Sequence, residues 1–249
     1  MDTEELNKKA VIAGIPRAII EKDYALSIVL FHVSKSRLAD KLVFKGGTAL
    51  KKIYFADARF SEDLDFSVLD VDEREIMNEL NALFEGKEFN GVRFITLEKE
   101  KTRVGMHAAL KFSSILGQPQ RIRFDFSFRD NLALKPERRI VADDYGLGDA
   151  KLLVLPLEEL FAEKIHALSG RTAARDLYDA WFLSKHGVKT DQRIIAKKFA
   201  YYGETYEPDA LANRIASFKK DWTRDLAQFM KNVPDFDLVA NETIGFLKK

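Results

Sequence analysis

The spacing of apolar residues divides the chain into a first part that mixes helices and strands and a second part that is helical. Apolar residues recur at helical spacing in some segments and alternate with polar residues in others. Helices are expected over residues 2–13, 16–35 and 72–84, and strands over residues 42–44, 92–97, 106–112 and 121–128. Beyond Pro156 the remaining apolar patterns all indicate helices.

The clearest strand lies at residues 121–128, where apolar and polar residues alternate strictly. Ile122, Phe124, Phe126 and Phe128 would be buried, whereas Arg121, Arg123, Asp125 and Ser127 would line the opposite face. Asp125 therefore places a carboxylate on a polar sheet face. The two arginines either are plain surface charges or share the carboxylate face and bind triphosphate or RNA.

A domain boundary is expected near residue 150, because residues 135–155 carry Pro136, Gly146 and Gly148 with mixed charge. The predicted fold class is α+β. Residues 1–150 would form a domain with a mixed sheet flanked by helices, and residues 151–249 would form a C-terminal helical region.

Composition narrows the class of protein without naming an activity. Of the 249 residues, 46% are hydrophobic, which is enough for a sizeable core. The chain has 40 basic and 39 acidic side chains, so its total charge neither favours nor opposes a polyanionic partner. The absence of cysteine excludes disulfides and thiolate zinc sites and agrees with a cytoplasmic location. The apolar runs are shorter than the ~18 residues of a membrane span, and the acidic N-terminus is unlike a signal peptide, so no membrane association is expected.

The stretch of residues 45–67 contains two features that suggest a phosphate site. Gly46, Gly47 and Thr48 follow the apolar run 42–44 and precede a helical pattern, so backbone N–H groups would be available to phosphate at the start of a helix. Further along, Asp63 and Asp65 are two residues apart, and in a strand both carboxylates would lie on one face.

These residue types suit nucleotidyl transfer, in which divalent cations neutralise the triphosphate and the leaving pyrophosphate. Asp63, Asp65 and Asp125 would supply oxygen ligands for Mg²⁺ or Mn²⁺, while Thr48 and Ser61 could add hydroxyl donors. The glycine spacing is not that of a Walker A loop, which argues against an ATPase of that class.

Simpler structural interpretations exist for these acids. An Asp-x-Asp pair on its own is more often solvated than metal-binding, and only the upstream Gly-Gly-Thr favours the metal site. The third acid could instead be Asp130 or the pair Asp143 and Asp144, although Asp125 alone sits centrally in an alternating strand.

A second group of charged residues lies in the helical part. Lys164 falls within the apolar stripe of the helix 157–168 and should face a cleft that holds anions, unless its stem covers the stripe while the ammonium reaches water. Asp176 and Asp179 are expected on the flank of the next helix, where they could merely pair with Arg175 and Arg171.

Several blocks of sequence resemble the AbiEii/AbiGii-type nucleotidyltransferase toxins, which belong to the DNA polymerase β-like nucleotidyltransferase superfamily. The resemblance spans most of residues 15–185. The blocks that carry it are Glu21-Lys22-Asp23-Tyr24, Phe44-Lys45-Gly46-Gly47-Thr48-Ala49-Leu50, Arg59-Phe60-Ser61-Glu62-Asp63-Leu64-Asp65-Phe66, Glu159-Leu160-Phe161-Ala162-Glu163-Lys164 and Arg175-Asp176-Leu177-Tyr178-Asp179.

The resemblance implies roles for individual residues. Asp63 and Asp65 would hold Mg²⁺, Lys164 would contact the nucleotide phosphates, and Asp176 or Asp179 would act as the base or orient it. Asp63, Asp65, Lys164, Asp176 and Asp179 are thus the expected catalytic residues, with nucleotide binding by Gly46, Gly47, Thr48, Ser61 and Lys164 and metal binding by Asp63, Asp65 and Asp125.

The resemblance also implies a toxin of a toxin–antitoxin or phage-defence system. Such an enzyme would transfer NMP from an NTP to an RNA acceptor, expected to be the 3′ end of tRNA, and block translation until an antitoxin intervenes. The alternatives are nucleotidylation of a protein or of a small molecule such as an aminoglycoside, and a catalytically silent NTP-binding regulator. Activity is expected to require the C-terminal helical region.

Overall fold

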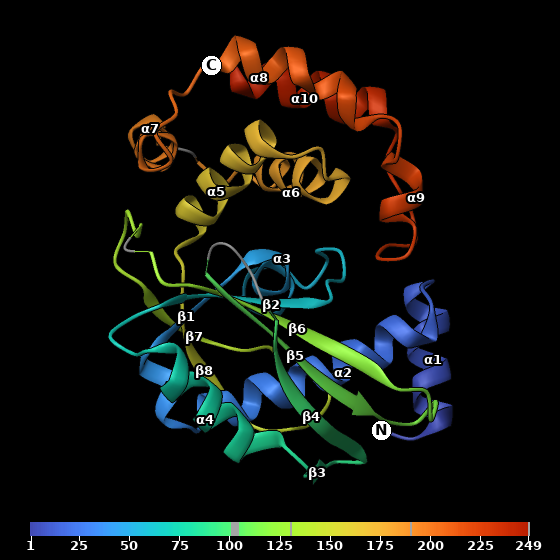
Figure 1. Ribbon diagram of the computed structural model, residues 1–249. Coiled ribbons are helices and arrows are strands. Elements are labelled where there is room, and N and C mark those ends of the chain that lie inside the picture. Colours follow the sequence, from blue (N-terminus) through green and yellow to red (C-terminus); the bar gives the residue numbers. More distant parts are fainter. Residues whose placement is uncertain (101–104, 130, 190, 249) are drawn as a thin grey trace. The chain divides into compact units, whose positions relative to one another are not determined.

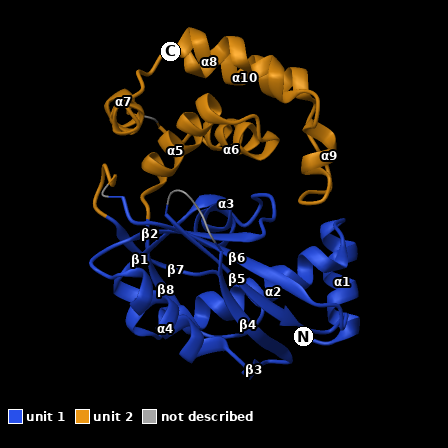
Figure 2. Ribbon diagram, in the orientation of Figure 1, with its two compact units in different colours: residues 1–130, 136–154 blue, residues 131–135, 155–249 orange. Residues whose placement is uncertain are grey.

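The computed structural model describes residues 1–100, 105–129, 131–189 and 191–248 (Figure 1). Its contacts divide the chain into two compact units (Figure 2). Unit 1 contains residues 1–130 and 136–154, and unit 2 contains residues 131–135 and 155–249. These units differ from the expected division at residue 150 in the placement of residues 131–135 and 151–154.

Unit 1 is built on a mixed sheet whose described strands follow the order β3-β4-β5-β6-β2-β1-β8-β7. The pairs β1–β8 and β2–β6 are parallel, and the other neighbours are antiparallel. The strands are β1 Leu42–Lys45, β2 Asp63–Val68, β3 Glu88–Phe89, β4 Val92–Glu100, β5 Met106–Ser113, β6 Gln120–Ser127, β7 Glu137–Ile140 and β8 Lys151–Val154. Together with the helices of both units, this sheet confirms the α+β class.

Unit 1 also contains helical elements, two of which cover one face of this sheet (Figure 1). The helical elements are α1 Thr3–Ala13, α2 Arg17–Ser34, η1 Arg37–Asp40, α3 Gly46–Ala49, the π-helical turn η2 Leu50–Tyr54 and α4 Glu73–Phe84. Apolar residues of α2 and α4 join those of the sheet in one core, in which Ile122, Phe124 and Phe126 of β6 are buried as their alternation predicts. The expectation that Phe128 is buried is wrong, because β6 ends at Ser127 and Phe128 is only partly buried. Asp72 begins α4 by accepting a hydrogen bond from Glu75 N at 2.8 Å.

Strands β7 and β8 were not expected from the sequence pattern. All four residues of β7 are exposed, so this edge strand carries no apolar alternation. In β8, Leu152 and Val154 are buried, and the strand pairs with β1. The segment around residues 135–155 is therefore part of the sheet rather than a linker.

Unit 2 is helical in its described residues, as predicted. Its elements are α5 Leu157–Gly170, α6 Ala174–Lys185, α7 Gln192–Tyr201, α8 Pro208–Arg214, η3 Ile215–Phe218, α9 Trp222–Leu226 and α10 Phe236–Leu247. None of the helices in the described part of the chain combines the length and apolar character needed to span a bilayer.

Two buried charged residues attach the segment 131–135 to the helices of unit 2. The Glu159 carboxylate, fully buried, accepts hydrogen bonds from Ala133 N and Leu134 N, each at 2.7 Å. Lys198 is 2% exposed, donates to Asn131 O at 2.8 Å and pairs with Glu159 at 2.5 Å. This mutual pairing satisfies both charges, which explains how they remain inside the helical unit.

Candidate active site

The turn between β1 and α3 brings the backbone of Gly46 against the carboxylate of Asp65. Gly46 has φ +78°, and a Cβ placed on it would lie 1.9 Å from Asp65 Oδ2. The pairing of Lys45 with Asp65 across β1 and β2 produces this approach. A side chain at position 46 is therefore excluded both by backbone conformation and by the acid beside it.

Gly47 is next to two polar side chains that enter from the chain just before β2. A Cβ on Gly47 would lie 3.0 Å from Arg59 Nη2 and 3.1 Å from Ser61 Oγ. Arg59 is only 5% exposed and donates from Nη1 to Phe60 O at 3.0 Å. The turn thus carries a buried guanidinium beside the Ser61 hydroxyl, a combination suited to phosphate.

The sequence pattern assigns Arg59 no role, although this residue begins one of the sequence blocks that carry the family resemblance. A single arginine in a polar loop carries no periodic signal of burial, and only the turn geometry reveals its position.

Thr48 has a partner within the protein. Its hydroxyl donates to Asp63 O at 2.6 Å, and the side chain is 1% exposed. A hydroxyl has one proton to donate, and Thr48 uses it for this hydrogen bond. Thr48 therefore holds the start of β2 against α3.

Strand pairing brings the predicted acids together. Asp63 and Asp65 lie two residues apart on β2, and Asp125 is in register with Asp65 across the parallel pair β2–β6. On the other side of Asp125, His107 Nε2 lies 3.1 Å from Asp125 Oδ2. Asp125 thus lies next to the Asp-x-Asp pair.

The alternatives for the third acid are used elsewhere or are not described. Asp143 accepts hydrogen bonds from Leu147 N and Gly148 N, which lower the pKa of its carboxyl. Asp144 pairs with Lys52 at 3.0 Å. Asp130 lies outside the described residues.

The three acids suit a hard divalent cation, although the described residues contain no preformed group of three or more side chains at metal-binding spacing. Mg²⁺ is commonly bound by one or two protein carboxylates together with substrate phosphates and water. Asp63 and Asp65 provide such a pair, and the Gly46 turn lies beside them. The donor set therefore fits an ion that is completed by a nucleotide.

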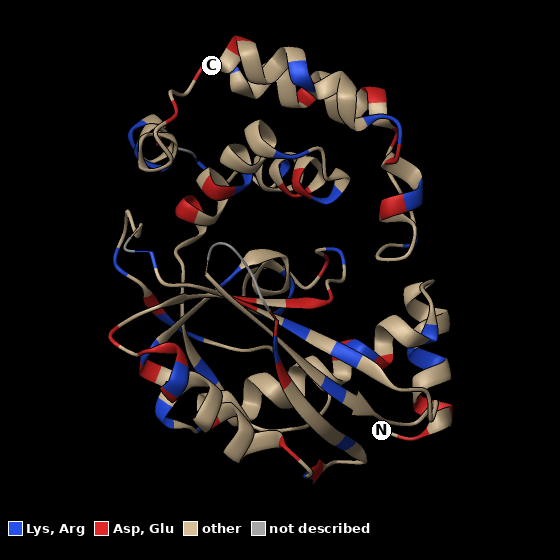
Figure 3. Ribbon diagram, in the orientation of Figure 1, with Lys and Arg blue, Asp and Glu red and all other residues tan. Residues whose placement is uncertain are grey.

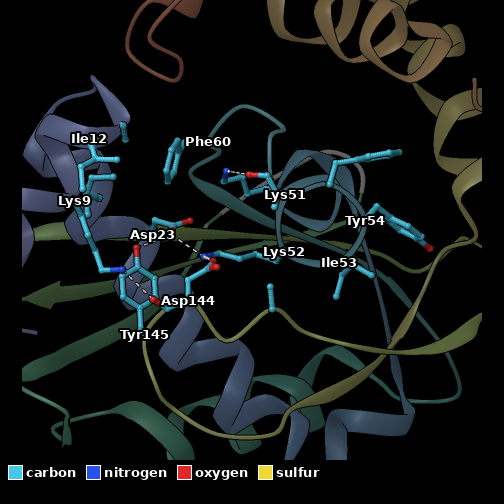
Figure 4. Close-up of a pocket in the computed structure, with 15 residues that line it drawn as sticks. Lys9, Ile12, Asp23, Lys51, Lys52, Ile53, Tyr54, Phe60, Asp144 and Tyr145 are labelled. Carbon is cyan, nitrogen blue, oxygen red and sulfur yellow. Dashed lines mark hydrogen bonds and ion pairs between the residues drawn. The ribbon is translucent and has the colours of Figure 1, made fainter. Parts of the chain in front are cut away.

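A polar network around the buried Lys52 holds the helical turn that follows the glycines (Figure 4). The Lys52 side chain is fully buried and contacts Asp23 Oδ2 at 2.6 Å and Asp144 Oδ2 at 3.0 Å, and the Tyr145 hydroxyl donates to Asp23 Oδ2 at 2.7 Å. Burial alone would lower the pKa of Lys52, but Asp23 and Asp144 outweigh burial and raise it. These groups, with Lys9, Lys51 and Phe60, line a cavity of about 530 Å³.

The pairing of Lys52 with Asp23 was not expected from the sequence pattern. Lys51 and Lys52 are adjacent and indistinguishable by charge, and the π-helical turn decides which of the two points inward. Asp23 lies in one of the sequence blocks that carry the family resemblance, 29 residues before Lys52.

In unit 2 the inward-pointing lysine is found as predicted. Lys164 is 9% exposed, and its ammonium lies 2.9 Å from Asp176 Oδ1 and 2.8 Å from Asp179 Oδ2. Both aspartates are 2% exposed, so the expectation that they lie on a helix flank is wrong. The anions that face Lys164 come from α6 itself.

Arg171 adds a second cation to this group. Its Nε lies 2.7 Å from Asp176 Oδ2, so the expected pairing of these aspartates with Arg171 is found for Asp176. Arg175, the other arginine expected to pair with them, lies over the ring of Phe229. Burial would raise the pKa of Asp176, but Lys164 and then Arg171 outweigh burial and hold the pKa far below its usual range. Asp176 is consequently ionised at all ordinary pH values.

Comparisons with known proteins agree with this geometry. A match to the family described as nucleotidyl transferase AbiEii toxin, type IV TA system, covers residues 28–242. No curated protein sequence matches the chain.

Among solved structures, MenT4, a nucleotidyltransferase toxin from Mycobacterium tuberculosis H37Rv, is similar with a TM-score of 0.78 and 23% identity over 100% of this chain and 90% of that chain. At this identity the likeness concerns the fold. An antigenic nucleotidyltransferase-like protein from Paracoccidioides brasiliensis has a TM-score of 0.40 and 15% identity over 85% of this chain and 94% of that chain, and carries no argument. From the family match over residues 28–242 we conclude that the chain belongs to the AbiEii family of nucleotidyltransferase toxins of toxin–antitoxin systems.

Proposed function

We propose that this toxin transfers NMP from an NTP to the 3′ end of tRNA and thereby stops translation until an antitoxin counteracts it. The observation that carries the proposal is the contact of the Gly46 backbone with the Asp65 carboxylate, with Asp125 in register on the next strand. In this proposal the turn at Gly46 binds phosphate, and the carboxylates that bind the metal ion lie directly beside that turn.

Each group around the turn has a defined task in this proposal. Asp63 and Asp65, with Asp125, hold Mg²⁺ or Mn²⁺, which when bound neutralises the triphosphate charge. Gly46 and Gly47 let the phosphates approach the backbone, and Ser61 donates a hydrogen bond to them.

The charged group of unit 2 is also assigned to catalysis. Lys164 binds the nucleotide phosphates by exchanging one of its two carboxylate partners for phosphate oxygen. The depressed pKa of Asp176 makes this acid a weak proton acceptor. We assign acceptance of the proton from the RNA hydroxyl to one of Asp176 and Asp179, both of which contact Lys164, and the orientation of Lys164 to the other.

To test the proposal, the protein is incubated with labelled NTPs, total tRNA and Mg²⁺ or Mn²⁺, and the 3′ ends of the RNA are then sequenced. The wild-type chain should extend tRNA, and Asp63→Asn should slow this at least about 100-fold, the equivalent of about 3 kcal/mol of transition-state stabilisation. Asp149→Asn is the matched control, because Asp149 is an exposed aspartate outside the site.

Other outcomes assign the chain differently. Label on a protein or on an aminoglycoside, with none on RNA, would keep the transferase and replace its acceptor. Binding of NTP without transfer to any acceptor, and growth inhibition that Asp63→Asn leaves unchanged, would contradict the enzymatic proposal and favour a silent regulator.

A further inference from the structure

The polar face of the sheet carries a group of basic residues beside the acids. Arg123 and Arg121 of β6, Lys111 of β5 and Arg93 of β4 form this group, here called the basic strip. Lys111 is in register with Arg121, and Arg93 is in register with Ser113, the next residue of β5 on the same face as Lys111. Figure 3 shows the blue segments on β4, β5 and β6 and the red segment on β2.

The basic strip is exposed and only partly neutralised. The side chains of Arg121, Arg123 and Lys111 are 60%, 46% and 44% exposed. Their acidic neighbours are Glu98, at 2.6 Å from Lys111, and Glu100, at 3.7 Å from Arg123 and 4.0 Å from Arg121. Exposed pairs of this kind contribute about 0–1 kcal/mol each, so the basic groups can exchange these partners for phosphates.

Strand order places the basic strip on the side of the acids opposite the glycine turn. Arg123 is in register with Asp63 across β6 and β2, and Asp125 follows it on the same face. The Gly46 turn lies at the end of β1, the neighbour of β2 on its other side. A triphosphate at the glycines and a polyanion on the basic strip would therefore meet at the acids.

The strip is also longer than one phosphate group requires. It crosses three strands, roughly 10 Å at the usual strand spacing, and extends from Arg123 to Arg121 by two residues, roughly 7 Å. Several basic side chains over such a distance suit the repeated charges of a nucleic-acid backbone.

We propose that the basic strip binds the phosphodiester backbone of the RNA acceptor and leads its 3′ end to Asp63, Asp65 and Asp125. This inference rests on the proposed transfer of NMP to RNA and names the surface that holds that acceptor. Because the contacts are to phosphates, the strip contributes affinity and orientation but no base specificity.

The double variant Lys111→Gln/Arg121→Gln tests the strip, since neither residue is among the predicted metal ligands. Binding of total tRNA is measured without NTP over a range of salt concentrations, and KM is measured separately for RNA and for NTP. The control is Arg138→Gln/Arg139→Gln on the edge strand β7, where both arginines are exposed and paired with acids. Urea unfolding of each variant verifies that the fold is retained.

We expect about tenfold weaker tRNA binding by the strip variant, a slope of log K against log salt that is less negative by about 1 to 2, a raised KM for RNA and an unchanged KM for NTP. The β7 control should bind tRNA as the wild type does. A wild-type salt slope in the strip variant would overturn the inference, and so would a raised KM for NTP with unchanged tRNA binding, which would assign the strip to the triphosphate.

The two proposals fail in different ways. If the wild type extends tRNA and the strip variant binds tRNA normally, the strip inference is overturned and the function stands. If the wild type binds tRNA through the strip but transfers nothing to it, the function fails while the strip remains a binding surface for RNA. Absence of tRNA binding by the wild type would overturn the strip directly.

Discussion

Gly46 and Gly86 share a left-handed backbone and differ in what surrounds them. Gly46 has φ +78° and Gly86 has φ +70°, but a Cβ on Gly46 would lie 1.9 Å from Asp65 Oδ2, whereas a Cβ on Gly86 would have no atom within 4 Å. The pair therefore separates the cost of the backbone conformation from the cost of displacing an acid.

We expect Gly46→Ala and Gly86→Ala each to lower the free energy of unfolding by about 1 kcal/mol for the backbone strain. Gly46→Ala should in addition abolish nucleotide transfer, because the new Cβ displaces Asp65 from its place beside the turn. Urea unfolding and the RNA-labelling assay measure the two effects. Full transfer activity in Gly46→Ala would show that the contact between Gly46 and Asp65 has no part in catalysis.

Helices α5 and α6 of unit 2 are joined through the ion pairs of Lys164. The Asp176 carboxyl has a folded pKa well below its value of about 3.9 in an unfolded chain. Its contribution to stability is therefore complete above about pH 5 and is lost as the pH falls toward the folded pKa.

Asp176→Asn should lower the free energy of unfolding at pH 7 by about 3 kcal/mol, since it removes one partner from a buried ion group. The loss of stability between about pH 5 and pH 2 should be less steep in this variant than in the wild type. Urea unfolding of the full-length wild type and variant at several pH values measures both effects. Asp237→Asn, which removes an exposed partner of Lys219, is the control and should change little; parallel pH curves for Asp176→Asn and the wild type would refute the assignment.

Elements with a strong periodic signal could be predicted from the sequence. The alternation of β6 was expected and is found, with Ile122, Phe124 and Phe126 buried. The edge strand β7 could not be predicted, because a fully exposed strand has no apolar period.

Those parts of the candidate site that depend on residue type and local spacing could be predicted from the sequence. Asp63, Asp65 and the inward Lys164 follow from local patterns. The burial of Asp176 and Asp179 and the pairing of Lys52 with Asp23 depend on residues that lie far apart in the sequence, so no local pattern could reveal them.

The predicted contribution of both units to catalysis can be tested by shortening the chain. A cut near residue 150 would remove β8, the parallel neighbour of β1, and would damage the sheet as well as remove the helices. A chain shortened after Leu155 keeps every described strand of unit 1.

We expect this shortened chain to unfold cooperatively in urea but to transfer no nucleotide, because Lys164, Asp176 and Asp179 are absent. Full-length Lys164→Gln provides the same test if the shortened chain does not fold, and should also lose transfer. Transfer by the shortened chain, or by Lys164→Gln at the wild-type rate, would contradict the requirement for unit 2.

The order in which the chain passes through its two units determines where chimeras of related toxins can be joined. Because residues 131–135 belong to unit 2 while residues 136–154 return to unit 1, the chain changes unit at three points. A chimera with a single junction at residue 154 would combine a foreign helical unit with a native segment 131–135, whose backbone is held by Glu159 and Lys198. Working hybrids of such toxins should therefore inherit this five-residue segment from the donor of the helices.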